Sequence, residues 1–126
     1  MLSSSMEKVS EINFYETESG SRPAEGFLDS LNSKAVQKLT WVMRFIEERQ
    51  GNVHGKFFEK LKHTDDIWEV KAKCGSNEYR MLRFINKKDI LLLVHGFQKK
   101  SQKTPKKDID TAEIRKKDHL RRFGNE

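Results

Sequence analysis

The sequence predicts an α+β domain in which two N-terminal helices and a C-terminal helix pack on a small, mainly antiparallel sheet. Three consecutive strand-like runs, separated by short polar turns, occupy residues 67–94. A segment with helical periodicity precedes them over residues 33–50, and a strongly basic one follows over residues 105–123. A length of 126 residues suits one domain, so we expect residues 1–126 to form a single unit with residues 1–9 flexible.

The N-terminal part supplies an edge strand and two helices. Apolar and polar side chains alternate over residues 11–17, which predicts the strand. Pro23 suits the first turn of a short helix, and Asn32 is placed to cap a longer one that Gly51 ends. The longer helix has one apolar stripe that we expect to face the sheet: Ala35, Val36, Leu39, Val42, Met43 and Ile46.

Two aromatic side chains of the longer helix lie away from this stripe. Trp41 and Phe45 are four residues apart, so they are neighbours on the helix surface. Either the preceding short helix covers them, or they form a docking site for another protein. Both explanations stay open, and Trp41 and Phe45 are candidate partner-binding residues.

The three central runs differ in the faces that they bury. Residues 68–74 alternate between an apolar face and a face with Glu69, Lys71 and Lys73. A turn at Gly75-Ser76-Asn77 predicts a hairpin, and the next run, residues 78–85, has apolar side chains on both faces. After a second turn, residues 90–94 are apolar without a break, which is typical of an interior strand.

Positive charge is concentrated toward the C-terminus of a chain whose net charge is +6. Lys and Arg outnumber Asp and Glu by 10 to 5 over residues 99–126 and by 9 to 6 over residues 56–98, but not over residues 1–55, where they are 6 against 8. Such a field attracts a polyanion, of which nucleic acid is the commonest in a cytoplasm. A solubilising lysine surface is the alternative explanation.

Several kinds of chemistry find no support in the sequence. The single cysteine excludes an internal disulfide, and no early run is long and apolar enough for a signal peptide or membrane span, so we expect a reducing cytoplasm. His54 and His63 lack a Cys or His partner at metal-ligand spacing, so no metal site is expected. The chain also lacks a Gly-rich phosphate loop and an HExxH motif.

The series WEVK, YRMLRF and an apolar run closing in HGFQKKSQKTP resembles the RelE/HigB-like bacterial toxins, in particular their phage-derived branch, over residues 14–123. The resemblance implies a RelE/ParE-like fold and the toxin of a toxin–antitoxin pair, which cleaves messenger RNA on the ribosome without a metal or other cofactor. The implied partners are a HigA-like helix-turn-helix antitoxin, the ribosome and messenger RNA. The resemblance implies that the toxin contacts operator DNA only as part of its complex with the antitoxin, and that no membrane is involved.

Relatives on this fold differ in activity, so two other functions stay open. One is a non-catalytic growth inhibitor such as a ParE-like gyrase poison. The other is a nucleic-acid-binding accessory protein without enzymatic activity. The neighbouring gene and the fate of messenger RNA after induction would distinguish these functions.

Cleavage of RNA by its own 2′-hydroxyl needs a base, a cation for the phosphate and an acid for the leaving oxygen. A lysine among other cations has its neutral form favoured and can act as the base, while an arginine stays charged and holds phosphate oxygens. The resemblance carries a catalytic lysine and arginine onto Lys71 and Arg80. A basic residue at the end of the last strand corresponds to Lys99 or Lys100, and we place Lys100 in the catalytic set.

The chain departs from the pattern of its relatives at two places. Glu69 stands where some relatives have a second lysine, and the tyrosine that some use near the chain end is missing, which leaves His119 as the candidate acid. The remaining basic residues form a candidate nucleic-acid-binding set. These are Lys73, Arg83, Lys99 and Lys103. An ordinary solvated strand face is the alternative explanation for Lys71 and Lys73.

Overall fold

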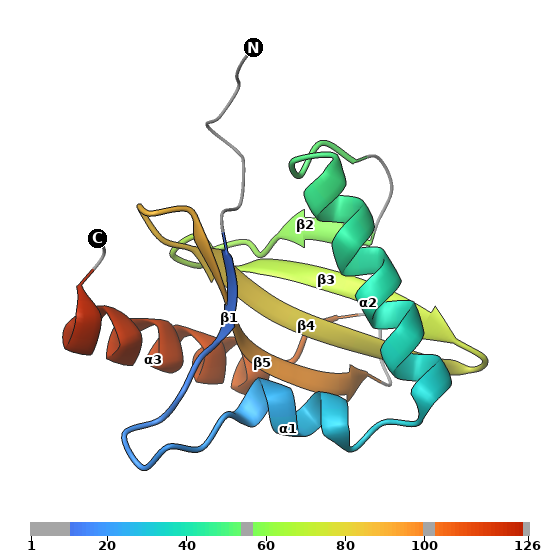
Figure 1. Ribbon diagram of the computed structural model, residues 1–126, viewed down its shortest axis with the longest axis horizontal. Coiled ribbons are helices and arrows are strands. Elements are labelled where there is room, and N and C mark those ends of the chain that lie inside the picture. The colour runs from blue at the N-terminus through green and yellow to red at the C-terminus, as the bar shows by residue number, and fades with distance from the viewer. Residues whose placement is uncertain (1–10, 54–56, 100–102, 125–126) are drawn as a thin grey trace.

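The strands form one mixed five-stranded sheet in the order β1-β5-β4-β3-β2, in a computed structural model that describes residues 11–53, 57–99 and 103–124. Three helices cover it, α1 and α2 in front and α3 behind in the view of Figure 1. This confirms the predicted α+β class. The elements are β1 (Glu11–Phe14), α1 (Pro23–Asp29), α2 (Ser33–Glu48), β2 (Phe58–Lys60), β3 (Trp68–Cys74), β4 (Asn77–Ile85), β5 (Ile90–Lys99) and α3 (Lys106–Phe123).

Strand β5 is interior, as its apolar run predicts. It pairs in parallel with the edge strand β1 and antiparallel with β4, and β4–β3 and β3–β2 are also antiparallel. The strand continues past Val94 to Lys99, because its pairing with β4 resumes after a register shift between Leu82 and Arg83. The apolar run alone did not predict this extension, which places Lys99 on the sheet.

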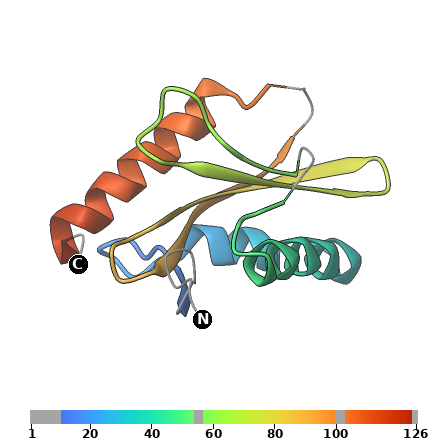
Figure 2. The same ribbon diagram turned by 90° about the horizontal axis from the view of Figure 1, so that it is seen from above.

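Each face of the sheet has its own hydrophobic core, and Figure 2 shows why: α1 and α2 lie on one face and α3 on the other. Strand β4 is therefore covered on both sides, as its two apolar faces predict. The α2 stripe faces the sheet, since Ala35, Leu39, Val42 and Ile46 are buried there with Val70 and Met81. Under α3, the buried side chains include Ile67, Leu82, Phe84, Leu92, Val94 and Ala112.

The helix ends follow the sequence signals with two exceptions. Asn32 accepts a hydrogen bond from the backbone N–H of Ala35 at 2.9 Å, and Gly51 follows α2 with φ of +79°. Helix α3 begins one residue later than expected, so Pro105 is its N-cap. The helical repeat puts Phe123 on the side of α3 that carries Ala112 and Lys116, but Phe123 is 63% exposed, because the end of that helix extends past the sheet (Figure 1).

Gly96 lets α1 approach β5 closely. A Cβ atom at this position would lie 2.3 Å from Cδ2 of Phe27 and 2.8 Å from Sδ of Met81. Neither neighbour can move far, because Met81 is fully buried and Phe27 packs against the same core. The glycine therefore fixes α1 against the strand that carries Lys99.

Candidate functional site

Candidate residues gather on one face of β3, β4 and β5, next to the β3–β4 hairpin turn. Lys71 lies opposite Arg80, and Glu78 lies opposite both Lys73 and Lys99. Side chains directly opposite one another in antiparallel strands share a face. We call Lys71, Lys73, Arg80 and Lys99 the basic face. It lies on the α3 side of the sheet, at the end that α3 leaves uncovered in Figure 2.

Arg80 is buried between two carboxylates. Its Nη1 lies 2.9 Å from Oε1 of Glu69, and its Nη2 lies 2.6 Å from Oε2 of Glu78. Glu69 is itself buried, and its second oxygen accepts a hydrogen bond from the Thr104 hydroxyl at 2.6 Å. A buried guanidinium needs such partners, since an unpaired charge there would be strongly destabilising. Thr104 therefore supports Glu69, and Pro105 is the N-cap of α3.

Lys99 is the buried cation of the basic face that lacks a partner. It is 6% exposed, and its Nζ has no hydrogen-bond partner among the described residues. Burial, and then the positive charge of Arg80, lower the pKa of the Lys99 amine, although Glu69 and Glu78 act in the opposite direction. A lysine in these surroundings is suited to taking up a proton or binding an anion.

Lys71 is placed differently. Its Nζ lies 2.6 Å from Oε1 of Glu59 on β2, and its side chain is 18% exposed. The ion pair holds the Lys71 ammonium toward β2 at the solvent-accessible edge of the basic face, and not among its buried side chains. Lys71 and Lys99 thus flank Arg80 on the two neighbouring strands, one paired and partly open to solvent, the other buried.

A histidine that sequence reasoning missed lies on the same face. His95 pairs with Leu82, its Nε2 lies 2.7 Å from Oδ1 of Asp108, and Nη1 of Arg115 lies 3.2 Å from its Nδ1. A guanidinium can only donate, so Nδ1 accepts and Nε2 carries the proton. Burial lowers the pKa of His95, which keeps it neutral. The ring therefore fastens α3 to β5 instead of serving as a free base.

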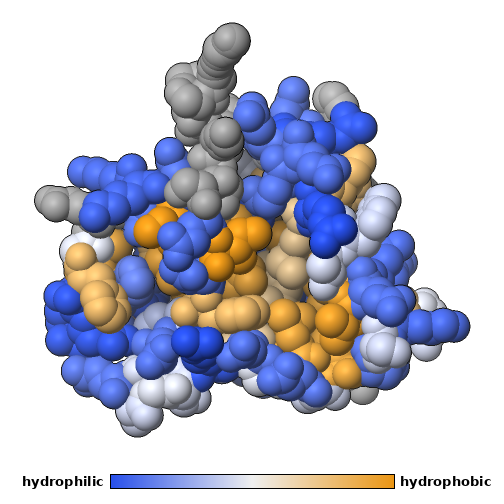
Figure 3. All heavy atoms as spheres, viewed as in Figure 1, coloured by the Kyte–Doolittle hydropathy of each residue, from blue (hydrophilic) through white to orange (hydrophobic). Residues whose placement is uncertain are grey.

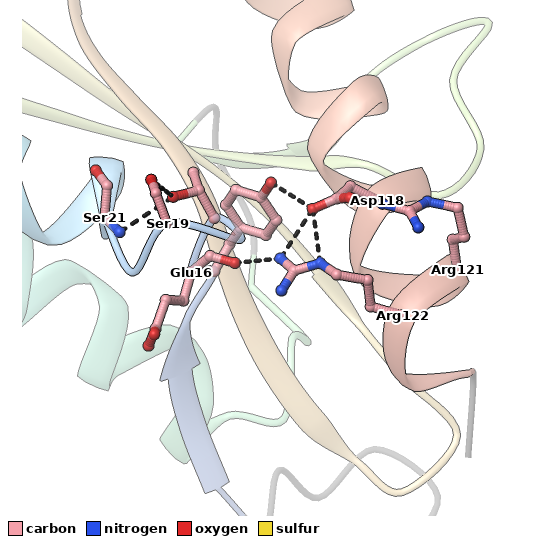
Figure 4. Close-up of polar contacts among 8 residues, drawn as sticks. Glu16, Ser19, Ser21, Asp118, Arg121 and Arg122 are labelled. Atoms are coloured by element: carbon pink, nitrogen blue, oxygen red, sulfur yellow. Dashed lines mark hydrogen bonds and ion pairs between the residues drawn. The ribbon is translucent and has the colours of Figure 1, made fainter.

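A second polar cluster fastens the far end of α3 (Figure 4). The Tyr15 hydroxyl donates to Asp118 at 2.7 Å, and Arg122 donates both to Asp118 and to the carbonyl oxygen of Glu16. The hydrogen bonds from Tyr15 and Arg122 lower the pKa of Asp118 to about 2. This cluster and the His95 cluster fix α3 at two points, and α3 in turn places Thr104 beside Glu69.

Not all of the predicted site residues reach the basic face. Arg83 lies on the opposite face, paired with Glu47 of α2 and stacked over the Phe58 ring at 4.4 Å. Arg83 is three positions after Arg80 in the strand, and an odd offset places a side chain on the other face. His119 packs against Phe84, which is four residues along β4 from Arg80, or about 13 Å.

Of the other candidate lysines, two lie at the edges of this site and one is outside the described residues. Lys73 is exposed beside Glu78, and Lys103 is exposed next to Thr104. Lys100 lies outside the described residues. The structure thus brings together Lys71, Arg80 and Lys99, with Lys73 and Lys103 near them.

The two aromatic residues of α2 are not covered by α1, so that expectation is wrong. Trp41 is 59% exposed and stacks on Phe45 at 5.5 Å, while Phe45 also contacts Phe57 at 5.7 Å. Helix α1 instead packs on β5. The Trp41 ring is therefore a surface feature.

The described residues include no group of three or more His, Cys, Asp or Glu side chains that could hold a metal ion. Among the same residues, no helix is both long and apolar enough to cross a membrane. Glu69, Glu78, Thr104 and His95 are site residues that the sequence did not single out as functional. A glutamate among lysines in an alternating strand, and a histidine inside an apolar one, were the available signals.

Comparison with known proteins identifies the family. Residues 26–117, well over half of the 126, match the family described as Phage derived protein Gp49-like (DUF891). No curated protein matches the chain. The matched range runs from α1 into α3 and so includes the whole basic face. The chain therefore belongs to the phage-derived Gp49-like family.

Proposed function

We propose that this protein is the toxin of a toxin–antitoxin pair, a metal-independent endoribonuclease that cleaves messenger RNA on the ribosome. Family membership and the resemblance to RelE/HigB-like toxins support the toxin role. The observation that carries the catalytic part is the buried Lys99 amine beside Arg80, which has no hydrogen-bond partner within residues 11–53, 57–99 and 103–124, with Lys71 on the other side. An amine with a lowered pKa next to a fixed cation is suited to proton transfer at a phosphodiester.

In the proposed reaction, the neutral Lys99 amine takes the proton of the 2′-hydroxyl. The 2′-oxygen then forms a bond to phosphorus, and the bond from phosphorus to the 5′-oxygen breaks. The Lys71 ammonium gives a proton to that leaving oxygen, while Arg80 stabilises the charge on the other phosphate oxygens. Exchange with solvent afterwards restores both lysines. Arg80 contacts the phosphate after its ion pair with Glu78, the more exposed of its two partners, has opened.

The proposed partners follow from this role. The ribosome presents the messenger RNA, and the exposed Lys73 and Lys103 contact its backbone. A small helix-turn-helix antitoxin covers the basic face and brings the complex to operator DNA. The exposed Trp41 ring with Phe45 gives the antitoxin an apolar anchor on α2.

Mapping messenger-RNA 5′ ends after induction in a bacterial host tests the proposal. Wild type should create new ends within translated messages before replication stops, and Lys99→Met should not. Lys87→Met, which changes an exposed lysine of the β4–β5 turn, should behave as wild type. Intact messages with early DNA breaks and an SOS response would identify a gyrase poison instead. Intact messages with neither response would favour an accessory protein.

A further inference from the structure

Phe97 is an aromatic side chain among the residues of the basic face, and the proposed reaction gives it no role. The strand register places Phe97 of β5 directly opposite Arg80 of β4, so both side chains lie on the α3 side of the sheet. Lys99 is two positions further along β5, which puts its side chain on the same face. The ring therefore lies next to the proposed phosphate-binding arginine and close to the proposed base.

The Phe97 ring is held in place but remains partly open to solvent. It packs against the core under α3 and stacks on the His95 imidazole, with 5.3 Å between the ring centroids and 24° between the planes. Contacts with Asp108 and Arg115 fix the imidazole in turn. A side chain that is already ordered loses little conformational freedom when a flat ligand stacks on it.

The charges around the Phe97 ring are close to balanced. The cations of the basic face lie among three carboxylates, because Glu59 pairs with Lys71, and Glu69 and Glu78 both pair with Arg80. Attraction between these cations and a phosphate is therefore partly offset by nearby anions. Binding of RNA here needs an uncharged contact as well, and stacking of a base on an aromatic ring is such a contact.

The order of the reacting groups across the sheet gives the bound RNA a direction. Lys99, Arg80 and Lys71 lie on β5, β4 and β3. In the proposed reaction, Lys99 takes the proton of the 2′-hydroxyl, which belongs to the nucleotide on the 5′ side of the cleaved phosphate. Lys71 protonates the oxygen of the nucleotide on the 3′ side. The 5′ nucleotide therefore lies over β5, the strand that carries Phe97.

We propose that Phe97 stacks on the base of the nucleotide that supplies the 2′-hydroxyl, and so holds that nucleotide beside Lys99 and Arg80. Every base has a flat π-face, so the ring accepts any of the four at this position. The inference rests on the proposed function, because the proposed reaction gives the RNA its direction.

A dinucleotide with a single phosphate tests the contact, because this phosphate fixes which of the two bases lies over β5. The probe is a dinucleoside monophosphate whose 5′ sugar is 2′-deoxy, which prevents cleavage, and it is titrated into the whole chain at low salt. Abasic forms that lack either the 5′ or the 3′ base are the matched ligands. Loss of the 5′ base should weaken binding about tenfold, and loss of the 3′ base should weaken it much less. In NMR spectra, the Phe97 ring protons should move upfield only when the 5′ base is present.

Two variants of Phe97 separate the ring from its volume. Phe97→Leu keeps an apolar side chain but removes the ring, so the dinucleotides with and without the 5′ base should bind within about twofold of each other. Phe97→Tyr keeps the ring, and the tenfold difference between the two ligands should remain.

The opposite face of the sheet offers a matched control. Figure 3 looks onto that face and shows apolar side chains gathered at its centre, with hydrophilic ones around them. Phe14 is partly buried there and packs against the core under α2. Phe14→Leu makes the same chemical change as Phe97→Leu, and it should leave the effect of the 5′ base as in wild type.

Three results would overturn the inference. They are a loss on removing the 5′ base that persists in Phe97→Leu, a coupling of Phe97 to the 3′ base instead, and the absence of any saturable shift of the Phe97 ring. Cleavage of messages without coupling between Phe97 and the 5′ base would refute the stacking contact and leave the proposed function standing. Coupling without cleavage would support the contact and refute the reaction.

Discussion

Arg80 and Glu78 form an ion pair in which the cation is buried and the anion reaches solvent. Their Nη2 and Oε2 atoms are 2.6 Å apart, and the side chains are 3% and 27% exposed. On its other side, Arg80 holds Glu69, whose side chain is only 2% exposed. We therefore expect a ligand arriving from solvent to replace Glu78 at Arg80 rather than Glu69.

Glu78→Gln should tighten RNA binding. The change removes the anion that competes with phosphate for Arg80 while keeping the shape of the side chain. A partly exposed ion pair is worth about 1 kcal/mol, so we expect the dissociation constant to fall about fivefold. Fluorescence anisotropy with a 2′-deoxy-substituted, uncleavable oligonucleotide measures this, with Glu48→Gln as the exposed control. Weaker binding in Glu78→Gln would mean that Glu78 orients Arg80 for the ligand rather than competing with it.

Arg80→Ala should destabilise the fold as well as remove activity. It leaves Glu69 buried without its cation, and breaking a buried ion pair from one side typically costs about 3–5 kcal/mol. Replacing both partners, with Arg80→Met and Glu69→Leu, should recover much of the loss. Urea unfolding of Arg80→Met, Glu69→Leu and the double variant measures the coupling. An Arg80→Ala protein as stable as wild type would show that Glu69 is solvated or protonated instead.

Lys99→Met should raise stability and abolish cleavage together. The folded state lowers the pKa of Lys99, so the charged lysine destabilises the fold below that pKa, and the effect disappears as pH rises toward 10.5. An apolar side chain removes the destabilisation and also removes the proposed base. Unfolding at pH 7 and single-turnover cleavage at saturating ribosomes are the two measurements. Reduced stability in Lys99→Met, with Lys87→Met unchanged, would indicate that the amine has a stabilising role.

The sequence predicted the basic side chains of the site better than the carboxylates that pair with them. The resemblance assigned Lys71 and Arg80 to one site, and the strand register places them opposite each other. Alternation along the second strand should have excluded Arg83 from that site. The carboxylates could not be assigned in this way. Pairing of Glu69 with Arg80 depends on the strand register and on Thr104, 35 residues away in the chain. The partnership of His95 with Asp108 depends on how α3 docks, which is a tertiary contact that no local pattern encodes.

Acid should loosen α3 through His95. Burial lowers its pKa below the ordinary value of 6.5, so its contribution to stability is complete above pH 6.5 and is lost as pH falls through the folded pKa. The groups that face it are Asp108, Arg115 and the stacked Phe97. Protonation would place a cation beside Arg115. We expect the melting temperature to fall between pH 7 and pH 5, and to fall less in His95→Gln.

Burial also lowers the pKa of His119, so the effect of protonating His119 on stability must be distinguished from that of protonating His95. Titration of both imidazoles by NMR assigns each one, and His119→Phe serves as the companion variant, since it keeps an aromatic ring against Phe84. A His95 that titrates above 6.5 would show that Asp108 stabilises the imidazolium more than burial disfavours it.

Variants at Trp41 and Phe45 should distinguish a role in antitoxin binding from a role in the stability of the fold. Trp41 is 59% exposed, so Trp41→Ala should change the melting temperature little, whereas Phe45 also packs against Phe57 and its truncation should destabilise the chain. If the antitoxin encoded by the neighbouring gene uses this surface, Trp41→Ala should weaken its binding by at least about tenfold, as an aromatic anchor does. Calorimetry with the purified pair measures this, and Ile114→Ala on α3 controls for loss of an exposed apolar side chain. Unchanged affinity in Trp41→Ala, with a reduced affinity in Lys99→Met, would place the antitoxin on the basic face alone.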